Sequence, residues 1–191
     1  MLIAKSFSFE AAHIVRFCAS KKCKTSIHGH SYKIELILES KALNEAGMVY
    51  DFGLLKLEIK QIIDSFDHSL LLFNKDNESY LKDAKKHSDR YVSLPLNISA
   101  ENLSIILFAL IEKLLNQTEK DNEVHVFSIK LFETENSYAQ AFKNDVFNED
   151  SSLKIDLNEI EFSKAIKAEW SDEDFYLKLL NNHIFINPKE I

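Results

Sequence analysis

Three histidines near the start of the chain have the spacing of a metal site. His28 and His30 lie two residues apart in a run of alternating polarity, so on a strand both side chains leave one face, roughly 6.6 Å apart. His13 ends an earlier strand-like run and can supply a third nitrogen from a paired strand. Three imidazoles hold Zn²⁺ and leave a fourth position open for water or substrate, which is typical of a catalytic zinc site. Since an isolated pair of this kind is a weak signal, surface or capping histidines are the alternative interpretation.

A cysteine lies five residues before the histidine pair and is a candidate nucleophile or base. Lys22 and Lys24 flank this residue, Cys23, and positive charge favours the reactive thiolate. An inert, small apolar side chain is the alternative for Cys23. The start of the chain does not resemble a signal peptide, so we expect a cytoplasmic protein in which Cys18 and Cys23 are free thiols rather than a disulfide.

The composition limits the class of protein. The 191 residues, 46% of them hydrophobic and 28% charged, suit one well-packed domain with an appendage. No run of about 18 apolar residues is present, so we expect no membrane span. The net charge of −7 and the lack of a nucleic-acid-binding motif argue against a nucleic-acid partner. Most of the negative charge lies in residues 144–191, which hold 11 acidic and 5 basic side chains.

The hydrophobic pattern predicts four strands and two main helices. Apolar residues at helical spacing predict one helix from an N-cap at Asp51 to Ser65 and another that follows an N-cap at Ser99. Strand, strand, helix, helix, strand, strand is the order of an α+β fold with an antiparallel sheet and helices on one face. The other face then needs a cover, for which we expect oligomerisation. Alternating polarity predicts the strands over residues 2–12, 29–39, 124–132 and 137–143.

Other segments have weaker patterns. Residues 14–27 are predicted to form a polar loop, and residues 74–94 a charged excursion with a short helix around 79–87. Residues 153–169 and 172–182 carry two weaker helical patterns. In the second strand we place His30 and polar side chains on one face, and on the other face the side chains of Tyr32, Ile34, Leu36 and Leu38.

Six segments occur in an order that resembles a known family. They are Phe7-Ser8-Phe9-Glu10-Ala11-Ala12-His13, Cys23 with His28-Gly29-His30-Ser31-Tyr32, Gly47-Met48-Val49-Tyr50-Asp51-Phe52, Phe66-Asp67-His68, Ser99-Ala100-Glu101-Asn102-Leu103 and Phe132-Glu133-Thr134. In this order they resemble the 6-pyruvoyl-tetrahydropterin synthase family, and within it the bacterial 6-carboxy-5,6,7,8-tetrahydropterin synthases of the queuosine and 7-deazapurine pathway. The resemblance covers about residues 2–143. We therefore expect a catalytic domain over 1–143 and an acidic, helical C-terminal extension over 144–191.

The resemblance implies a fold and an assembly. Members of this family are T-fold proteins, with four antiparallel strands and two helices in each subunit. Three subunits close a barrel, and two such rings commonly stack into a hexamer, so we expect a homo-oligomer of two trimers. Active sites lie at subunit interfaces, where one site can contain residues from different chains.

The resemblance also implies a role for each candidate residue. Cys23 matches the catalytic cysteine, and Asp67 and His68 match its acid and base partners, which a neighbouring subunit often supplies. Zn²⁺ is the implied cofactor, and its implied ligands are His13, His28 and His30.

Three further residues are implied to bind the substrate, a pterin triphosphate. Glu133 matches the carboxylate that grips the pterin ring, since a carboxylate accepts two parallel N–H bonds from the 2-amino-pyrimidinone edge. Ser99 and Glu101 match a segment that lines the pterin pocket.

The implied reaction converts 7,8-dihydroneopterin triphosphate to 6-carboxy-5,6,7,8-tetrahydropterin and releases acetaldehyde and triphosphate. No external redox cofactor is needed, because the hydrogen shifts are internal to the substrate. The pyruvoyl-type reaction on the same substrate is the nearest alternative, because the same residues serve both. The others are a catalytically idle metal-binding module and aldol-type cleavage, which occurs in relatives where glutamate replaces the cysteine.

The chain departs from the family pattern in three places. Four residues separate Cys23 from His28, whereas many close bacterial relatives have three and the pyruvoyl-type enzymes five. Cys18 therefore remains an alternative candidate for the functional thiol. Residues 74–94 are longer than in compact relatives, and residues 144–191 lie outside the resemblance, where we expect a packing or assembly element.

Overall fold

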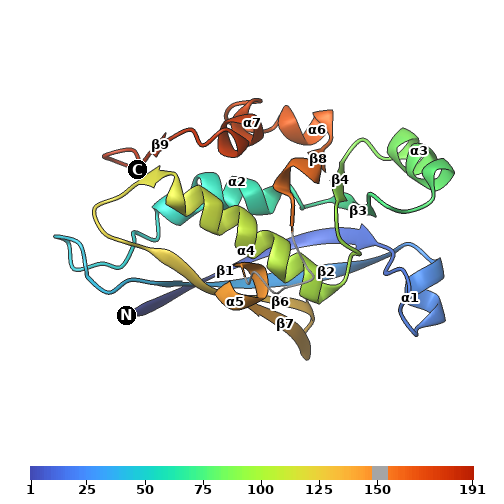
Figure 1. The fold of residues 1–191 in the computed structure, drawn as a ribbon, viewed down its shortest axis with the longest axis horizontal. Coiled ribbons are helices and arrows are strands. Elements are labelled where there is room, and N and C mark those ends of the chain that lie inside the picture. Colours follow the sequence, from blue (N-terminus) through green and yellow to red (C-terminus); the bar gives the residue numbers. More distant parts are fainter. Residues whose placement is uncertain (148–154) are drawn as a thin grey trace.

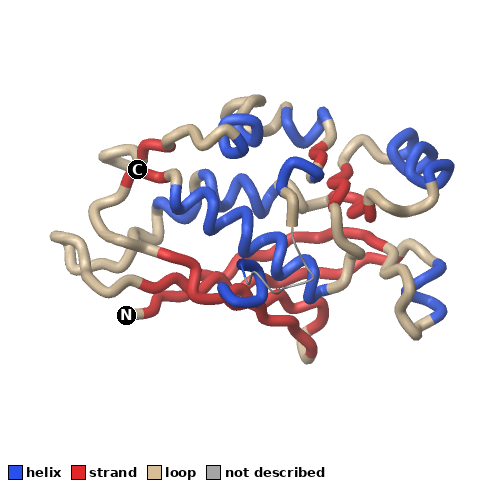
Figure 2. Tube along the Cα trace, in the orientation of Figure 1, coloured by secondary structure: helices blue, strands red, loops and turns tan. Residues whose placement is uncertain are grey.

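The computed structural model describes residues 1–147 and 155–191, which form a mixed sheet with helices on one face (Figures 1 and 2). The strands are β1 (Leu2–His13), β2 (His28–Glu39), β3 (Ser69–Phe73), β4 (Tyr91–Leu94), β5 (Thr118–Glu119), β6 (His125–Thr134), β7 (Ser137–Phe142), β8 (Glu161–Phe162) and β9 (Phe185–Ile186). The α-helices are α1 (Lys21–Thr25), α2 (Glu58–Asp64), α3 (Glu78–His87), α4 (Ala100–Asn116), α5 (Lys143–Phe147), α6 (Lys164–Lys167) and α7 (Phe175–Leu180). Two 3-10 turns span Leu54–Lys56 and Leu157–Glu159.

Four long antiparallel strands form the centre of the sheet, as the alternating polarity predicts. β1 pairs with β2 along its whole length, from Leu2 opposite Glu39 to His13 opposite His28. β2 pairs with β6, and β6 with β7, both antiparallel. The four predicted strands are confirmed, with ends that differ by one or two residues. The side chains of β2 that form the core are fully buried, namely Tyr32, Ile34, Leu36 and Leu38.

Three short strands extend this sheet beyond the four that the sequence predicts. β3 pairs with β1 and β4 pairs with β3, both in parallel, and β8 lies antiparallel to β4 at the edge. These strands have two to five residues, which is too short for a period in polarity to be recognised. The α+β class is confirmed, and the sheet is mixed rather than purely antiparallel.

The two main helices cover one face of the sheet, with α4 against β6 and β7 and α2 against β1 (Figure 1). The side chain of Ser99 accepts a hydrogen bond from the Asn102 N–H at 3.3 Å, which confirms the predicted N-cap of α4. The helix predicted around residues 79–87 is also confirmed, as α3. Within residues 1–147 and 155–191, none of the helices combines the length and apolar character needed to span a bilayer.

The helix predicted to start at Asp51 begins later. Asp51 Oδ1 accepts a hydrogen bond from the Gly53 N–H at 2.7 Å, which closes a local turn. A 3-10 turn follows, and α2 then begins at Glu58. The N-cap prediction at Asp51 is wrong because aspartate also bonds the amide two residues further on in turns, and the sequence does not distinguish the two uses.

The C-terminal segment packs over α2 and the short strands (Figure 1). The helix predicted over 153–169 is wrong for its described part, which holds a 3-10 turn, β8 and the single turn α6; residues 153 and 154 lie outside the described residues. The helix predicted over 172–182 is present as the shorter α7. Phe162 is buried with its ring 6.1 Å from the Phe66 ring and 5.3 Å from the Trp170 ring. The apolar residues of this segment therefore serve packing against the core, not a helical stripe.

Candidate metal and catalytic site

The three predicted histidine ligands converge where β1 ends and β2 begins. The strand register sets His13 opposite His28 and Ala11 opposite His30. One ring nitrogen from each histidine lies within 4.8 Å of the others, and the ring centroids are 4.6 to 5.2 Å apart. The pairing of β1 with β2 thus brings His13 next to His28 and His30, which their two-residue spacing already places on one face of β2.

His28 and His30 share the core face of β2 with Tyr32, so the predicted division of that strand into faces is wrong. Residues 28, 30 and 32 differ by two and must leave the same side of a strand. The Tyr32 ring lies edge-on to the rings of His13 and His30, and its hydroxyl is 3.2 Å from His13 Nδ1. The histidines therefore end the same row of side chains that forms the hydrophobic core.

Each of the three histidines has a feature that suits metal binding. Burial, reinforced by the neighbouring His28 and His30, lowers the pKa of His13 to about 4, so its ring is neutral at neutral pH. His28 Nδ1 lies 3.0 Å from the Ser26 carbonyl oxygen, to which it can donate while Nε2 stays available to a metal. His30 Nε2 is buried with no hydrogen-bond partner among the described residues. Because such an orphaned nitrogen is costly and a bound cation would satisfy it, the donor set fits zinc.

A cavity of about 390 Å³ beside the histidines joins most of the other predicted site residues. Its walls come from the cysteine-bearing loop, β2, the start of α4 and the β6–β7 hairpin. Cys18 also lines the cavity, so both thiols can reach a bound molecule. The predicted residues in its lining are Cys23, His28, His30, Ser99, Glu101 and Glu133.

The Glu133 carboxylate lies at the edge of the histidine cluster. Its Oε1 is 3.5 Å from His13 Nε2 and 3.6 Å from His30 Nε2. Since His13 is neutral at neutral pH, its contact with Glu133 is a polar contact and not an ion pair. Glu133 is partly exposed to the cavity, and a carboxylate in this place can accept hydrogen bonds from a substrate that also reaches the histidines.

Cys23 is held in a loop with more structure than the sequence predicts. It lies in the short helix α1, and its carbonyl oxygen accepts a hydrogen bond from the Val15 N–H at 3.0 Å. The guanidinium of Arg16 donates to the Lys24 carbonyl oxygen at 2.9 Å and pairs with Asp76 at 2.6 Å. The loop is therefore held against the segment that leads into α3. This contact limits how far Cys23 can move relative to the histidines.

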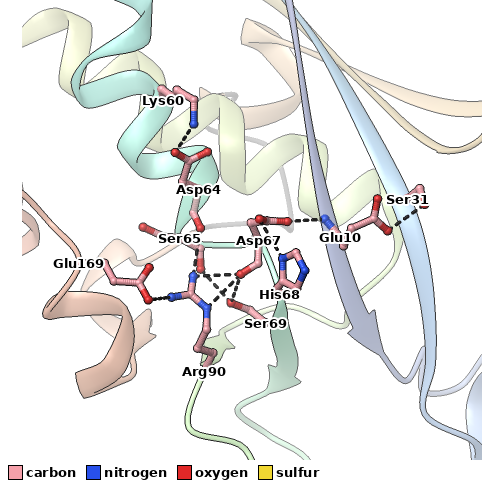
Figure 3. A network of polar contacts seen from close by, with 10 residues as sticks. All are labelled: Glu10, Ser31, Lys60, Asp64, Ser65, Asp67, His68, Ser69, Arg90 and Glu169. Carbon is pink, nitrogen blue, oxygen red and sulfur yellow. Dashed lines mark hydrogen bonds and ion pairs between the residues drawn. The ribbon is translucent and has the colours of Figure 1, made fainter.

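Asp67 and His68 lie in the turn between α2 and β3 (Figure 3). Neither residue is in the lining of this cavity. Asp67 Oδ2 is 2.9 Å from His68 Nδ1, and Asp67 Oδ1 accepts a hydrogen bond from the Glu10 N–H at 2.7 Å. Burial alone would raise the pKa of Asp67, but the hydrogen bonds from the Glu10 amide and from His68 outweigh it and lower this pKa. An ionised carboxylate thus orients the imidazole.

The backbone of His68 is strained. Its φ of 50° lies in the left-handed region, which costs on the order of 1–3 kcal/mol for a residue other than glycine. The His68 N–H donates to the Glu10 carbonyl oxygen at 2.6 Å, which ties the turn to β1. His68 lines a second cavity, of about 510 Å³, and His30 lines both cavities. Within this chain, His68 and Cys23 thus line different cavities that meet at His30, and Asp67 is in the lining of neither.

Three contributors to these sites were not predicted from the sequence. Tyr32 supports the cluster, and its two-residue spacing from His30 is the signal that was missed. Ser26 acts through its backbone carbonyl, which no side-chain pattern reveals. Arg90 donates to the Asp67 carbonyl oxygen from Nε at 3.1 Å and from Nη2 at 2.9 Å, across 23 residues of sequence.

Comparisons with known proteins identify the family of the chain. The family model described as 6-pyruvoyl tetrahydropterin synthase matches residues 2–144. A protein from Helicobacter pylori named 6-carboxy-5,6,7,8-tetrahydropterin synthase is 34% identical over 95% of this chain and 92% of its own length. A protein of the same name from Rickettsia bellii is 35% identical, over 71% of this chain and 96% of its own length.

Solved structures show the same fold. An uncharacterized protein from Wolinella succinogenes matches with a TM-score of 0.60 and 22% identity, over 75% of this chain and 98% of that chain. The 6-pyruvoyl tetrahydropterin synthase of Caenorhabditis elegans matches with a TM-score of 0.52 and 24% identity, over 74% of this chain and 94% of that chain. These structures show the fold, and the family model and the Helicobacter relative together show that the chain belongs to the 6-pyruvoyl tetrahydropterin synthase family.

Proposed function

We propose that the chain is a zinc-dependent 6-carboxy-5,6,7,8-tetrahydropterin synthase. It converts 7,8-dihydroneopterin triphosphate and one water molecule to 6-carboxy-5,6,7,8-tetrahydropterin, acetaldehyde and triphosphate. The observation that carries the proposal is the cavity in which Cys23 and Glu133 face the histidine cluster. The Helicobacter relative supports the choice within the family, because its match extends over nearly the whole chain. The proposed setting is queuosine and 7-deazapurine biosynthesis in the cytoplasm.

The histidine cluster is the proposed zinc site. His13, His28 and His30 would hold the ion, which when bound supplies a Lewis acid for the side-chain oxygens of the substrate. His28 and His30 line the cavity, so those oxygens reach the cluster from the same space that Cys23 faces.

Cys23 is the proposed base. In the thiolate form it would remove a proton from the substrate side chain. Glu133 accepts hydrogen bonds from the 2-amino-pyrimidinone edge of the pterin and so fixes which carbon lies near the thiol. Ser99 and Glu101, at the start of α4, line the same pocket and limit how the ring can lie.

Asp67 and His68 are the proposed proton carriers. Because they lie outside the Cys23 cavity of their own subunit, we propose that they act in the cavity of a neighbouring subunit. This requires a homo-oligomer, and a hexamer of two barrel-forming trimers is the assembly we propose. We assign the chemistry to residues 1–143 and a supporting role to the extension over 144–191.

Anaerobic incubation of the zinc-loaded protein with 7,8-dihydroneopterin triphosphate tests this function. Product mass and acetaldehyde are followed together. Acetaldehyde released with 6-carboxy-5,6,7,8-tetrahydropterin is the expected result. Loss of triphosphate with a retained three-carbon side chain would assign the pyruvoyl-type reaction instead. A protein that holds zinc without turnover would be a metal-binding module, and the proposal would be wrong.

A further inference from the structure

The turn that carries Asp67 and His68 is held by a residue outside both cavities. The carboxylate of Asp67 is engaged by the Glu10 amide and by the His68 ring. Its backbone carbonyl oxygen accepts two hydrogen bonds from one guanidinium, that of Arg90, at 3.1 and 2.9 Å (Figure 3). This carbonyl belongs to the peptide that joins Asp67 to His68. Two donors from one planar group fix the tilt of that peptide, and the tilt sets the direction of the strained His68.

Arg90 is itself held by the C-terminal segment. Its Nη1 pairs with Oε1 of Glu169 at 2.5 Å, and its Nη2 also donates to the Asp64 carbonyl oxygen at 3.2 Å (Figure 3). The Arg90 side chain is 20% exposed, so it is largely shielded from solvent. Glu169 lies beyond residue 144, where the family match ends.

The residues after Glu169 anchor the same segment to α2 and to the turn. Trp170 Nε1 donates to Ser65 Oγ at 2.8 Å, and this indole is buried. The Ser171 N–H donates to Gln61 Oε1 at 2.8 Å. Glu169 is therefore presented to Arg90 from a docked segment and not from a free chain end.

We propose that Arg90, held by Glu169, is a positioning residue for the Asp67–His68 pair. Its effect on turnover rests on the proposed function, whereas its effect on the turn does not. Arg90 acts through the Asp67 peptide. The C-terminal segment thus supports the turn that carries the proton carriers of this chain, in addition to packing against the core.

A second ion pair joins the same two parts of the chain and serves as a matched control. Lys85 Nζ pairs with Glu161 Oε2 at 2.6 Å, and the Lys85 side chain is 31% exposed, comparable to Arg90. Among the described residues, Lys85 has no hydrogen bond or ion pair with Asp67 or His68. Arg90→Met and Lys85→Met each remove one cation and one ion pair to the C-terminal segment. Only Arg90→Met frees the Asp67 carbonyl.

Amide hydrogen exchange in the full chain tests the effect on the turn without using activity. In Arg90→Met the amides of Glu10 and His68, which bond across the turn, should exchange about tenfold faster than in the wild type. In Lys85→Met they should exchange as in the wild type. Glu169→Gln should increase the exchange rate of these amides less, because the Glu169 carboxylate is exposed. This variant replaces Arg90→Met in the experiment if Arg90→Met does not fold. Unchanged exchange in Arg90→Met, or in Glu169→Gln where it substitutes, would overturn the proposal whatever the activity.

Kinetics of the same variants test the consequence for turnover. Arg90→Met should lower kcat about ten- to a hundredfold and leave KM within about twofold, because the pterin contacts remain. In a His68→Ala background, Arg90→Met should lower kcat no further, since both changes act on one unit. If Arg90→Met lowers kcat in the His68→Ala background as much as it does in the wild type, Arg90 does not act through the Asp67–His68 pair. A wild type that gives no turnover would refute the proposed function, and the exchange experiment would still decide the role of Arg90.

Discussion

Replacing Tyr32 by Phe removes one hydroxyl from beside the histidine cluster and leaves the aromatic ring in the core. Tyr32 and His13 are both fully buried, and the hydroxyl is 3.2 Å from His13 Nδ1. Burial, reinforced by Glu133, raises the pKa of Tyr32, so the phenol is protonated at neutral pH. Without it, His13 Nδ1 loses this buried partner, which costs about 1–3 kcal/mol of stability.

The same hydroxyl should also affect metal binding. A partner on the second ring nitrogen fixes the orientation of a metal-binding histidine, and its loss typically weakens metal affinity about ten- to a hundredfold. We therefore expect Tyr32→Phe to raise the Kd for zinc by that factor. Competition with a chromophoric chelator measures the Kd, and urea unfolding of the zinc-free protein measures the stability.

Tyr176→Phe is the matched control. Tyr176 is also buried, and its hydroxyl donates to the Leu157 carbonyl oxygen at 2.6 Å in the C-terminal segment. This variant should lose roughly 1 kcal/mol or more of stability and keep the wild-type Kd for zinc. If Tyr32→Phe binds zinc as tightly as the wild type, the hydroxyl does not orient His13 and the reasoning is wrong. Equal weakening in both variants would assign the effect to general stability.

Three further predictions follow from the site. Cys23→Ala should abolish turnover while zinc content stays at the wild-type value, and Cys18→Ala should keep most of the activity; the reverse pattern in steady-state assays would make Cys18 the functional thiol. Glu133→Gln should raise KM for the pterin because the amide accepts through only one oxygen, and an unchanged KM would exclude this contact. Because the pKa of His13 is about 4 when folded and 6.5 in the unfolded chain, the unfolded state binds more protons between these values. The zinc-free protein should therefore lose stability as pH falls from about 6.5 to about 4, and urea unfolding of His13→Gln should show a smaller pH dependence.

The predicted faces of β2 and the predicted N-cap at Asp51 are both wrong, for different reasons. The faces of β2 could have been assigned correctly, since residues 28, 30 and 32 must leave one side of a strand. Asp51 is different, because a turn and a helix N-cap both place a carboxylate near a backbone N–H. Only the course of the backbone after Asp51 distinguishes a turn from a helix N-cap.

The sequence by itself determined the features that depend on residues a few positions apart. The long strands follow from alternating polarity, and the start of α4 follows from Ser99 and the apolar stripe behind it. The pair His28 and His30 follows from a two-residue spacing on a strand, and the ordered motifs identified the family.

The tertiary structure decided which distant side chains complete each site. Short strands such as β3, β4 and β8 have too few residues to show a period, so their order in the sheet depends on packing. His13 meets His28 through strand register, and Arg90 meets Asp67 and Glu169 through the docking of segments far apart in sequence. Such contacts are set by the burial of the whole chain, because a hydrogen bond between distant residues forms only where packing brings its donor and acceptor together.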